Sequence, residues 1–140
     1  MADFLHSVGA RLRTWFGNRR QPLRRRARIP CSISLYDERE LKSGKLPGTA
    51  LSGNTIDISS SGLAFTVPVI RIGHRYIAGD NRTLRIILEL PTGSVESFAV
   101  ATRYERLEED QELKGYVVGA RITRMSDSDR ENLSNYLLKL

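Results

Sequence analysis

Two short motifs in this chain combine residue types that suit a ligand with phosphate groups and purine edges. Arg24 and Arg28 have the spacing RxxxR just before the first predicted strand, and Asp57, Ser59 and Gly62 form DxSxxG at the end of a later one. Guanidinium groups present planar forks of N–H donors that match phosphate oxygens and guanine edges. An Asp and a Ser on a turn add acceptors, a hydroxyl donor and backbone N–H groups.

Each motif alone also has a purely structural interpretation. The RxxxR spacing is easily met in a solvated basic linker, and Arg20 with Arg24 meets it as well. A DxSxxG segment is typical of a capped turn between two strands, in which the Asp57 and Ser59 oxygens accept hydrogen bonds from local backbone N–H groups. The occurrence of both motifs in one chain therefore indicates a ligand site more specifically than either motif alone.

The charge of the chain is concentrated near its N-terminus. Residues 1–28 hold eight arginines and one carboxylate, a net charge of +7, whereas the other 14 basic and 15 acidic residues give −1. This asymmetry predicts that the N-terminal arm contacts an anion. A nucleotide, a nucleic acid, a membrane surface and an acidic protein all fit that description.

Composition limits the remaining classes of function. The 140 residues, 40% of them apolar, fit one domain with a modest core. No run approaches the roughly 18–20 apolar residues of a membrane span, and the N-terminus does not resemble a secretory signal, which fits a cytoplasmic protein. Cys31 is expected to be a buried small hydrophobe, and the separation of His6 from His74 argues against a metal site.

The chain divides into three segments by periodicity and charge. Residues 3–16 place apolar side chains at helical spacing, so an amphipathic helix is predicted within residues 1–17. Its apolar face packs on the domain or on a second copy of it, or it docks on a membrane surface or a protein partner. Residues 18–28 are predicted to be a basic flexible arm that carries RxxxR, and residues 29–140 the folded domain.

The folded domain is predicted to be mainly β. Strands are expected at 29–35, 50–58, 63–67, 83–90, 95–104 and 116–122. Residues 127–140 read as a helix capped by Ser126 or Ser128, and residues 68–81 fit a short strand, a helical turn or a long loop. Six strands and one closing helix indicate a small antiparallel β-barrel or sandwich with the helix packed against it.

The order of these features resembles the PilZ domain, a bacterial receptor module for the second messenger cyclic di-GMP. The resemblance covers roughly residues 23–140 and rests on both motifs and on the strand-rich body with its C-terminal helix. It implies a six-stranded antiparallel β-barrel. It also implies that the ligand rests on the barrel surface at the second motif, with the arginine segment folded over it.

Carried over by position, the resemblance implies a role for each motif residue. Arg24 and Arg28 would bind the phosphates and the guanine Hoogsteen edges, because arginine contacts N7 and O6 together. Asp57 would accept from guanine N–H groups, and Ser59 would hydrogen-bond near the base or phosphate. Gly62 would permit the turn and a close backbone approach.

The register within the arm follows from the position of the first strand. Arg28 directly precedes that strand, as in the family pattern, so Arg24 with Arg28 is preferred over Arg20 with Arg24. The two arginines between them are extra charges, and Arg25 is an additional candidate for a ligand contact. Leu23 stands where an added arginine favours a stacked pair of ligands in the family, and both one ligand and a pair stay open.

These features predict a non-catalytic receptor that needs no metal or other cofactor. Cyclic di-GMP would pin the arm at 18–28 to the barrel and re-aim the helix at 3–16 for a protein effector or a second copy of the chain. The alternative is a basic adaptor that binds a membrane surface or a nucleic acid through residues 1–28. Asp57 favours the receptor over this adaptor, because guanine recognition uses a carboxylate and a purely anion-binding surface does not.

Overall fold

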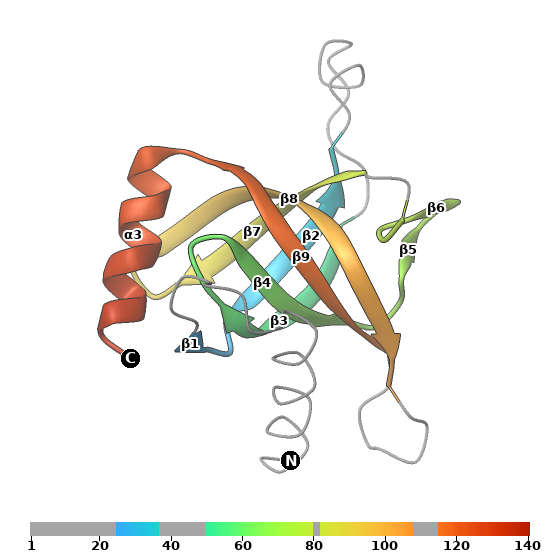
Figure 1. Cartoon of the computed structure of the whole chain (residues 1–140), viewed down its shortest axis with the longest axis horizontal. Helices are drawn as coiled ribbons and strands as arrows, with labels where there is room; N and C mark the ends of the chain where they lie inside the picture. The colour runs from blue at the N-terminus through green and yellow to red at the C-terminus, as the bar shows by residue number, and fades with distance from the viewer. Residues whose placement is uncertain (1–24, 37–49, 80–81, 108–114) are drawn as a thin grey trace.

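The computed structural model describes residues 25–36, 50–79, 82–107 and 115–140 (Figure 1). The predicted helix at 3–16 lies outside these residues. The described elements are β1 (Arg25–Arg26), β2 (Pro30–Leu35), β3 (Leu51–Ile58), β4 (Gly62–Val67), β5 (Arg71–Ile72), β6 (Arg75–Tyr76), β7 (Thr83–Leu90), β8 (Gly93–Arg106), β9 (Tyr116–Met125) and α3 (Asp127–Leu138). Within these stretches, no helix is long and apolar enough to cross a membrane.

Six of the strands close into an antiparallel barrel. β3, β2, β7, β8, β9 and β4 are hydrogen-bonded in that order, and β4 pairs back with β3 to complete the ring (Figure 1). Closure gives each of these strands a partner on both sides, which removes the exposed edges of an open sheet. The prediction of a six-stranded antiparallel barrel with a C-terminal helix is confirmed.

The barrel interior is filled by the side chains that alternate along each strand. In β7, Leu84, Ile86 and Leu88 are fully buried, and the residues between them are only half-buried. Ser97 is buried opposite this strand, and its hydroxyl donates to the Ile86 carbonyl oxygen at 3.1 Å. Cys31 is buried as predicted, and this burial raises the pKa of its thiol to about 12.

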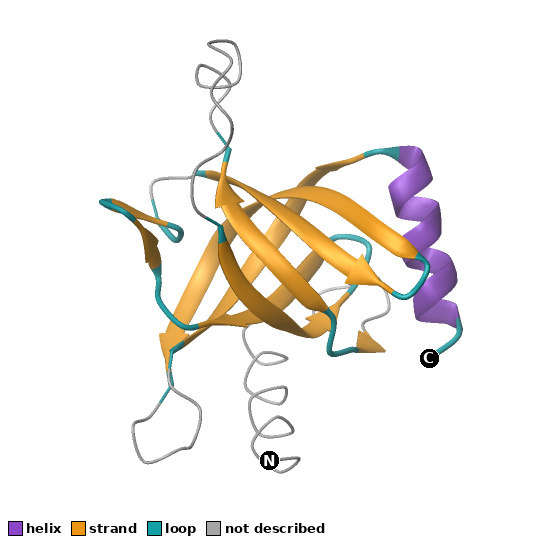
Figure 2. Ribbon diagram, turned by 180° about the vertical axis from the view of Figure 1, so that it is seen from behind, coloured by secondary structure: helices purple, strands orange, loops and turns teal. Residues whose placement is uncertain are grey.

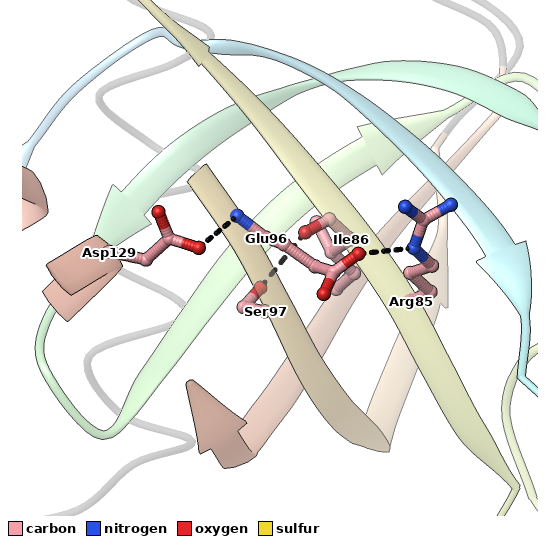
Figure 3. A network of polar contacts seen from close by, with 5 residues as sticks. All are labelled: Arg85, Ile86, Glu96, Ser97 and Asp129. Atoms are coloured by element: carbon pink, nitrogen blue, oxygen red, sulfur yellow. Dashed lines mark hydrogen bonds and ion pairs between the residues drawn. The ribbon is translucent and has the colours of Figure 1, made fainter. Parts of the chain in front are cut away.

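Helix α3 lies at one end of the barrel and is fixed at its first turn. Ser126, one of the two predicted caps, accepts a hydrogen bond from the Asp129 backbone N–H at 3.1 Å. The Asp129 carboxylate in turn accepts from the Glu96 backbone N–H of β8 at 3.1 Å, and the Glu96 side chain pairs with Arg85 at 2.6 Å (Figure 3). Leu133 on the inner side of the helix belongs to the buried core.

Residues 68–81, for which the sequence leaves three alternatives, contain a small hairpin. β5 and β6 pair only with each other among the described strands, around Gly73, whose φ is 62°. Ile70 and Ile77 are buried at the base of the hairpin, where the Ile77 N–H donates to the Ile70 carbonyl oxygen at 2.9 Å. The hairpin and α3 lie at opposite ends of the barrel (Figure 2).

The described part of the basic arm, residues 25–28, begins with a short strand, whereas the sequence predicts a flexible arm. β1 pairs with the end of β3, with Arg25 opposite Ile58 and Arg26 opposite Asp57. β2 pairs with the beginning of the same strand. The chain therefore runs along β3 from Arg25 onward, because its backbone groups find partners there.

Candidate functional site

Asp57 lies on the outer face of the barrel between β1 and β4. Ile58, the next residue of β3, and its cross-strand partner Leu63 both belong to the core. Successive residues of a strand point to opposite faces, so Asp57 points outward. The cross-strand partners of Asp57 are Arg26 in β1 and Ala64 in β4. Asp57 is only 5% exposed, and a buried carboxylate needs polar or cationic neighbours to offset its lost hydration. Arg26 supplies a cation at the adjacent position.

A β-bulge in β3 gives Asp57 its outward direction. The register between β3 and β4 shifts between Thr55, which is opposite the core residue Phe65, and Asp57, which is opposite Ala64. Ile56 is therefore an extra residue in β3. Residues two apart in an unbroken strand face the same side, so the bulge lets Thr55 and Asp57 face opposite sides of the sheet.

The Ser59 hydroxyl organises the turn between β3 and β4. It accepts hydrogen bonds from the Ser61 and Gly62 backbone N–H groups at 3.3 and 3.2 Å. The Ser59 backbone N–H donates to the Gly62 carbonyl oxygen at 2.8 Å. Ser59 is 1% exposed, so its hydroxyl is used by the turn itself, as the capped-turn interpretation of DxSxxG expects.

Gly62 stands where β9 approaches the motif most closely. A Cβ atom at this position would lie 3.0 Å from the Ala120 carbonyl oxygen. The Ile122 N–H donates to the Ser61 carbonyl oxygen at 2.8 Å, which ties β9 to the same turn. Gly62 is not among the described glycines with positive φ. The close approach of another backbone, rather than a left-handed conformation, therefore accounts for glycine here.

The arm places two arginines on the same outer face as Asp57. Arg26 and Arg28 are exposed, and the alternating Ala27 and Ile29 are buried. Arg26 is directly opposite Asp57, and Arg28 follows two residues later along the same segment. The structure therefore brings Arg28 and Asp57 of the two predicted motifs to neighbouring positions.

The other arginines of the arm have different positions. Arg25 is opposite Ile58 and points away from the side of Arg26, and Arg24 lies outside the described residues. Sequence reasoning treats Arg26 only as an extra charge and does not place it beside Asp57. The alternation of apolar residues before the first strand continues back through Ile29 to Ala27, and this pattern indicates that Arg26 faces outward.

Two further arginines from the C-terminal part of the chain stand beside the turn. Arg121 of β9 is exposed and is the cross-strand partner of Gly62. Arg130 of α3 donates from Nη1 to the Ser60 carbonyl oxygen at 3.3 Å. Together with the two outward arginines of the arm, they place four arginines along the end of β3 and its turn. Such a surface attracts phosphate groups, while Asp57 offers an acceptor for N–H donors.

Comparison with known proteins identifies a family for this chain. The family model described as PilZ domain matches residues 18–139. No curated protein sequence matches the chain significantly.

Solved structures share the fold at low sequence identity. The PilZ domain of YcgR from Escherichia coli with c-di-GMP is 14% identical, with a TM-score of 0.63 over 88% of this chain and 92% of that one. The K. pneumonia MrkH–c-di-GMP complex is 18% identical, with a TM-score of 0.61 over 87% and 51% of the two chains. The Bacillus subtilis inhibitor of motility MotI/DgrA is 19% identical, with a TM-score of 0.59 over 87% and 50%. The present chain thus spans about half the length of the last two proteins.

Proposed function

This chain belongs to the PilZ domain family, and on that basis we propose that it is a non-catalytic receptor for cyclic di-GMP. The observation that carries the proposal is the outer face on which the buried carboxylate of Asp57 lies beside the outward-facing Arg26 and Arg28. The YcgR domain and MrkH, which have the same fold, were solved with c-di-GMP, and this supports the choice of ligand.

The ligand's chemistry fits the two kinds of group at this face. Its two phosphates are anions, and its guanines carry N7 and O6 acceptors on one edge and N–H donors on another. Arg28, with Arg24 from the arm, binds phosphate oxygens and the N7–O6 edge through paired donors. Asp57 accepts from the guanine N–H groups, which selects guanine because adenine presents an acceptor at N1.

The remaining motif residues support these contacts. Ser59 shapes the turn and lies near the base or phosphate, and Gly62 permits the close approach of the β9 backbone to that turn. Arg25 and Arg26 add positive charge, and we place Arg26 nearer to the guanine-binding carboxylate. No reaction is required of these residues, since binding alone is their task.

The output of binding is a change in the arm. Residues 25–29 are hydrogen-bonded to β3 and form the fixed point from which the preceding residues close over the ligand. We propose that this closure re-aims the segment 3–16 toward a protein effector or a second copy of the chain. Hydrogen exchange over residues 18–24, with and without cyclic di-GMP, tests this step. Equal protection in both states would contradict it.

Calorimetric titration with cyclic di-GMP tests the binding function. The parent should bind, and Arg28→Ala and Asp57→Ala should each lose about 1.5–3 kcal/mol, or roughly tenfold to a hundredfold in affinity. Arg71→Ala is the matched control, because Arg71 is an exposed arginine of the hairpin at the opposite end of the barrel. Cyclic di-AMP serves as the control ligand for guanine selectivity.

Two results would overturn the proposal. Binding that Arg28→Ala and Asp57→Ala leave at the parental affinity would refute the site assignment. Absence of binding to cyclic di-GMP, together with salt-sensitive binding to anionic vesicles or random DNA, would replace the receptor with a basic adaptor.

A further inference from the structure

The segment that presents Arg28 also contains a β-bulge relative to β3. The Ala27 N–H donates to the Ile56 carbonyl oxygen at 3.2 Å, and the Thr55 N–H donates to the Ile29 carbonyl oxygen at 2.9 Å. Arg28 and Ile29 therefore stand opposite a single residue of β3, which is Thr55. This arrangement makes Arg28 the extra residue of the arm, and bulges of this kind re-aim a side chain.

One side chain spans this bulge. The Thr55 hydroxyl donates to the Ala27 carbonyl oxygen and accepts from the Ile29 backbone N–H at 2.8 Å. Thr55 is 2% exposed, so water does not compete with these two bonds. The hydroxyl replaces the backbone partner that the bulge removes and fixes the main chain on both sides of Arg28.

We propose that Thr55 is a positioning residue for cyclic di-GMP binding, an inference that rests on the proposed function. Its hydroxyl holds the backbone of Arg28, and it stands two residues before Asp57 in β3. One side chain thereby sets the spacing between the guanidinium and the carboxylate that contact the ligand. A preorganised arginine loses less conformational freedom on binding than a mobile one.

The side chain at this position must both donate and accept. Valine has nearly the same shape as threonine but offers neither function, whereas serine retains both. Thr55→Val therefore removes the bridge with little change in volume, and Thr55→Ser keeps it. A suitable control is Ser97→Ala, which removes another buried hydroxyl that bonds a backbone carbonyl oxygen, that of Ile86, away from the arm (Figure 3).

Amide exchange and ligand titration on the full chain test the inference together. In Thr55→Val the Ile29 amide should exchange faster, because it loses its acceptor. The affinity for cyclic di-GMP should fall about fivefold to tenfold, and Thr55→Ser should stay within about twofold of the parent. The affinity of Ser97→Ala should also stay within about twofold of the parent, although this variant should be less stable.

A double-mutant cycle separates positioning from a general loss of stability. If Thr55 acts through Arg28, Thr55→Val should change affinity by less than about twofold once Arg28→Ala is present. An equal loss in both backgrounds, or parental affinity in folded Thr55→Val, would overturn the inference. If Thr55→Val does not fold, Thr55→Cys, with a weaker donor and acceptor, should bind more weakly than the parent, and parental affinity would overturn it.

Failure of the inference can be told apart from failure of the proposed function. A parent chain that does not bind cyclic di-GMP overturns the function and the inference with it. A parent chain that binds, with Thr55→Val equal to it, overturns the inference alone and leaves the receptor function standing.

Discussion

The sharpest prediction contrasts two adjacent arginines of the arm. Arg25→Ala and Arg26→Ala remove the same charge at neighbouring positions of β1. Arg26 is opposite Asp57 and exposed on the outer face, whereas Arg25 is opposite Ile58 and points to the other side. The two variants therefore control for each other's loss of charge, and they differ in the face of the strand and in burial, since Arg25 is half-buried.

The expected magnitudes differ enough to be measured. A hydrogen bond to a charged group contributes about 1.5–3 kcal/mol, and the exposure of Arg26 favours the lower end, about tenfold in affinity. The charge of Arg25 is expected to attract a ligand phosphate only at long range, across water. A unit charge at about 8 Å contributes about 0.5 kcal/mol in water, which is about twofold, and salt lowers it further.

Titration with cyclic di-GMP at low and at physiological salt reports both effects. We expect Arg26→Ala to weaken binding about tenfold at both salt concentrations. The small loss in Arg25→Ala should shrink as salt rises, because a long-range charge effect is screened. Equal losses for the two variants would refute the reasoning, since they would show that net charge matters and the face of β1 does not.

Three further predictions concern the turn and the core. Ser59→Ala should lower the free energy of unfolding in urea by about 1–3 kcal/mol, because two backbone N–H groups lose their acceptor; an unchanged midpoint would contradict the role of Ser59 in the turn. Gly62→Ala should cost about 1–3 kcal/mol in the same assay, since its Cβ would press on the Ala120 carbonyl oxygen; parental stability would show that β9 yields freely. The Cys31 pKa of about 12 predicts that stability falls from about pH 9 to pH 12, because the unfolded thiol ionises first, with a slope of at most about 1.4 kcal/mol per pH unit. Cys31→Ala should lose this part of the pH dependence, and an identical alkaline profile would contradict it.

The strands were predictable because alternation is a local property. Leu84, Ile86 and Leu88 repeat at every second position, and this pattern alone identifies the buried face of β7. The end of β3 and its turn were equally visible, because Asp57 to Gly62 has the chemistry of a capped turn. The family resemblance then supplied closure of the strands into a barrel, which no local pattern contains.

The residue of β3 that each arm residue faces was not predictable in the same way. Cross-strand partners follow from counting residues only where the register is unbroken, and the chain has bulges at Arg28 and Ile56. Which of Arg25 and Arg26 neighbours Asp57 depends on pairing with β3, which is a tertiary contact. The choice of Ser126 over Ser128 as the cap likewise depends on where α3 docks against β8.

The two bulges lie on opposite edges of β3 and meet at Thr55. On one edge the arm has an extra residue relative to β3, and on the other β3 has an extra residue relative to β4. A closed barrel with unbroken ladders would offer the ligand only alternating side chains at fixed spacing. Because both ladders contain a bulge, the buried hydroxyl of Thr55, the outward carboxylate of Asp57 and the outward guanidinium of Arg28 occupy nearby positions. The core stays filled at the same time. We therefore expect ligand binding at this face to depend on backbone register as much as on the charged side chains, because the register decides which of these side chains share the outer surface.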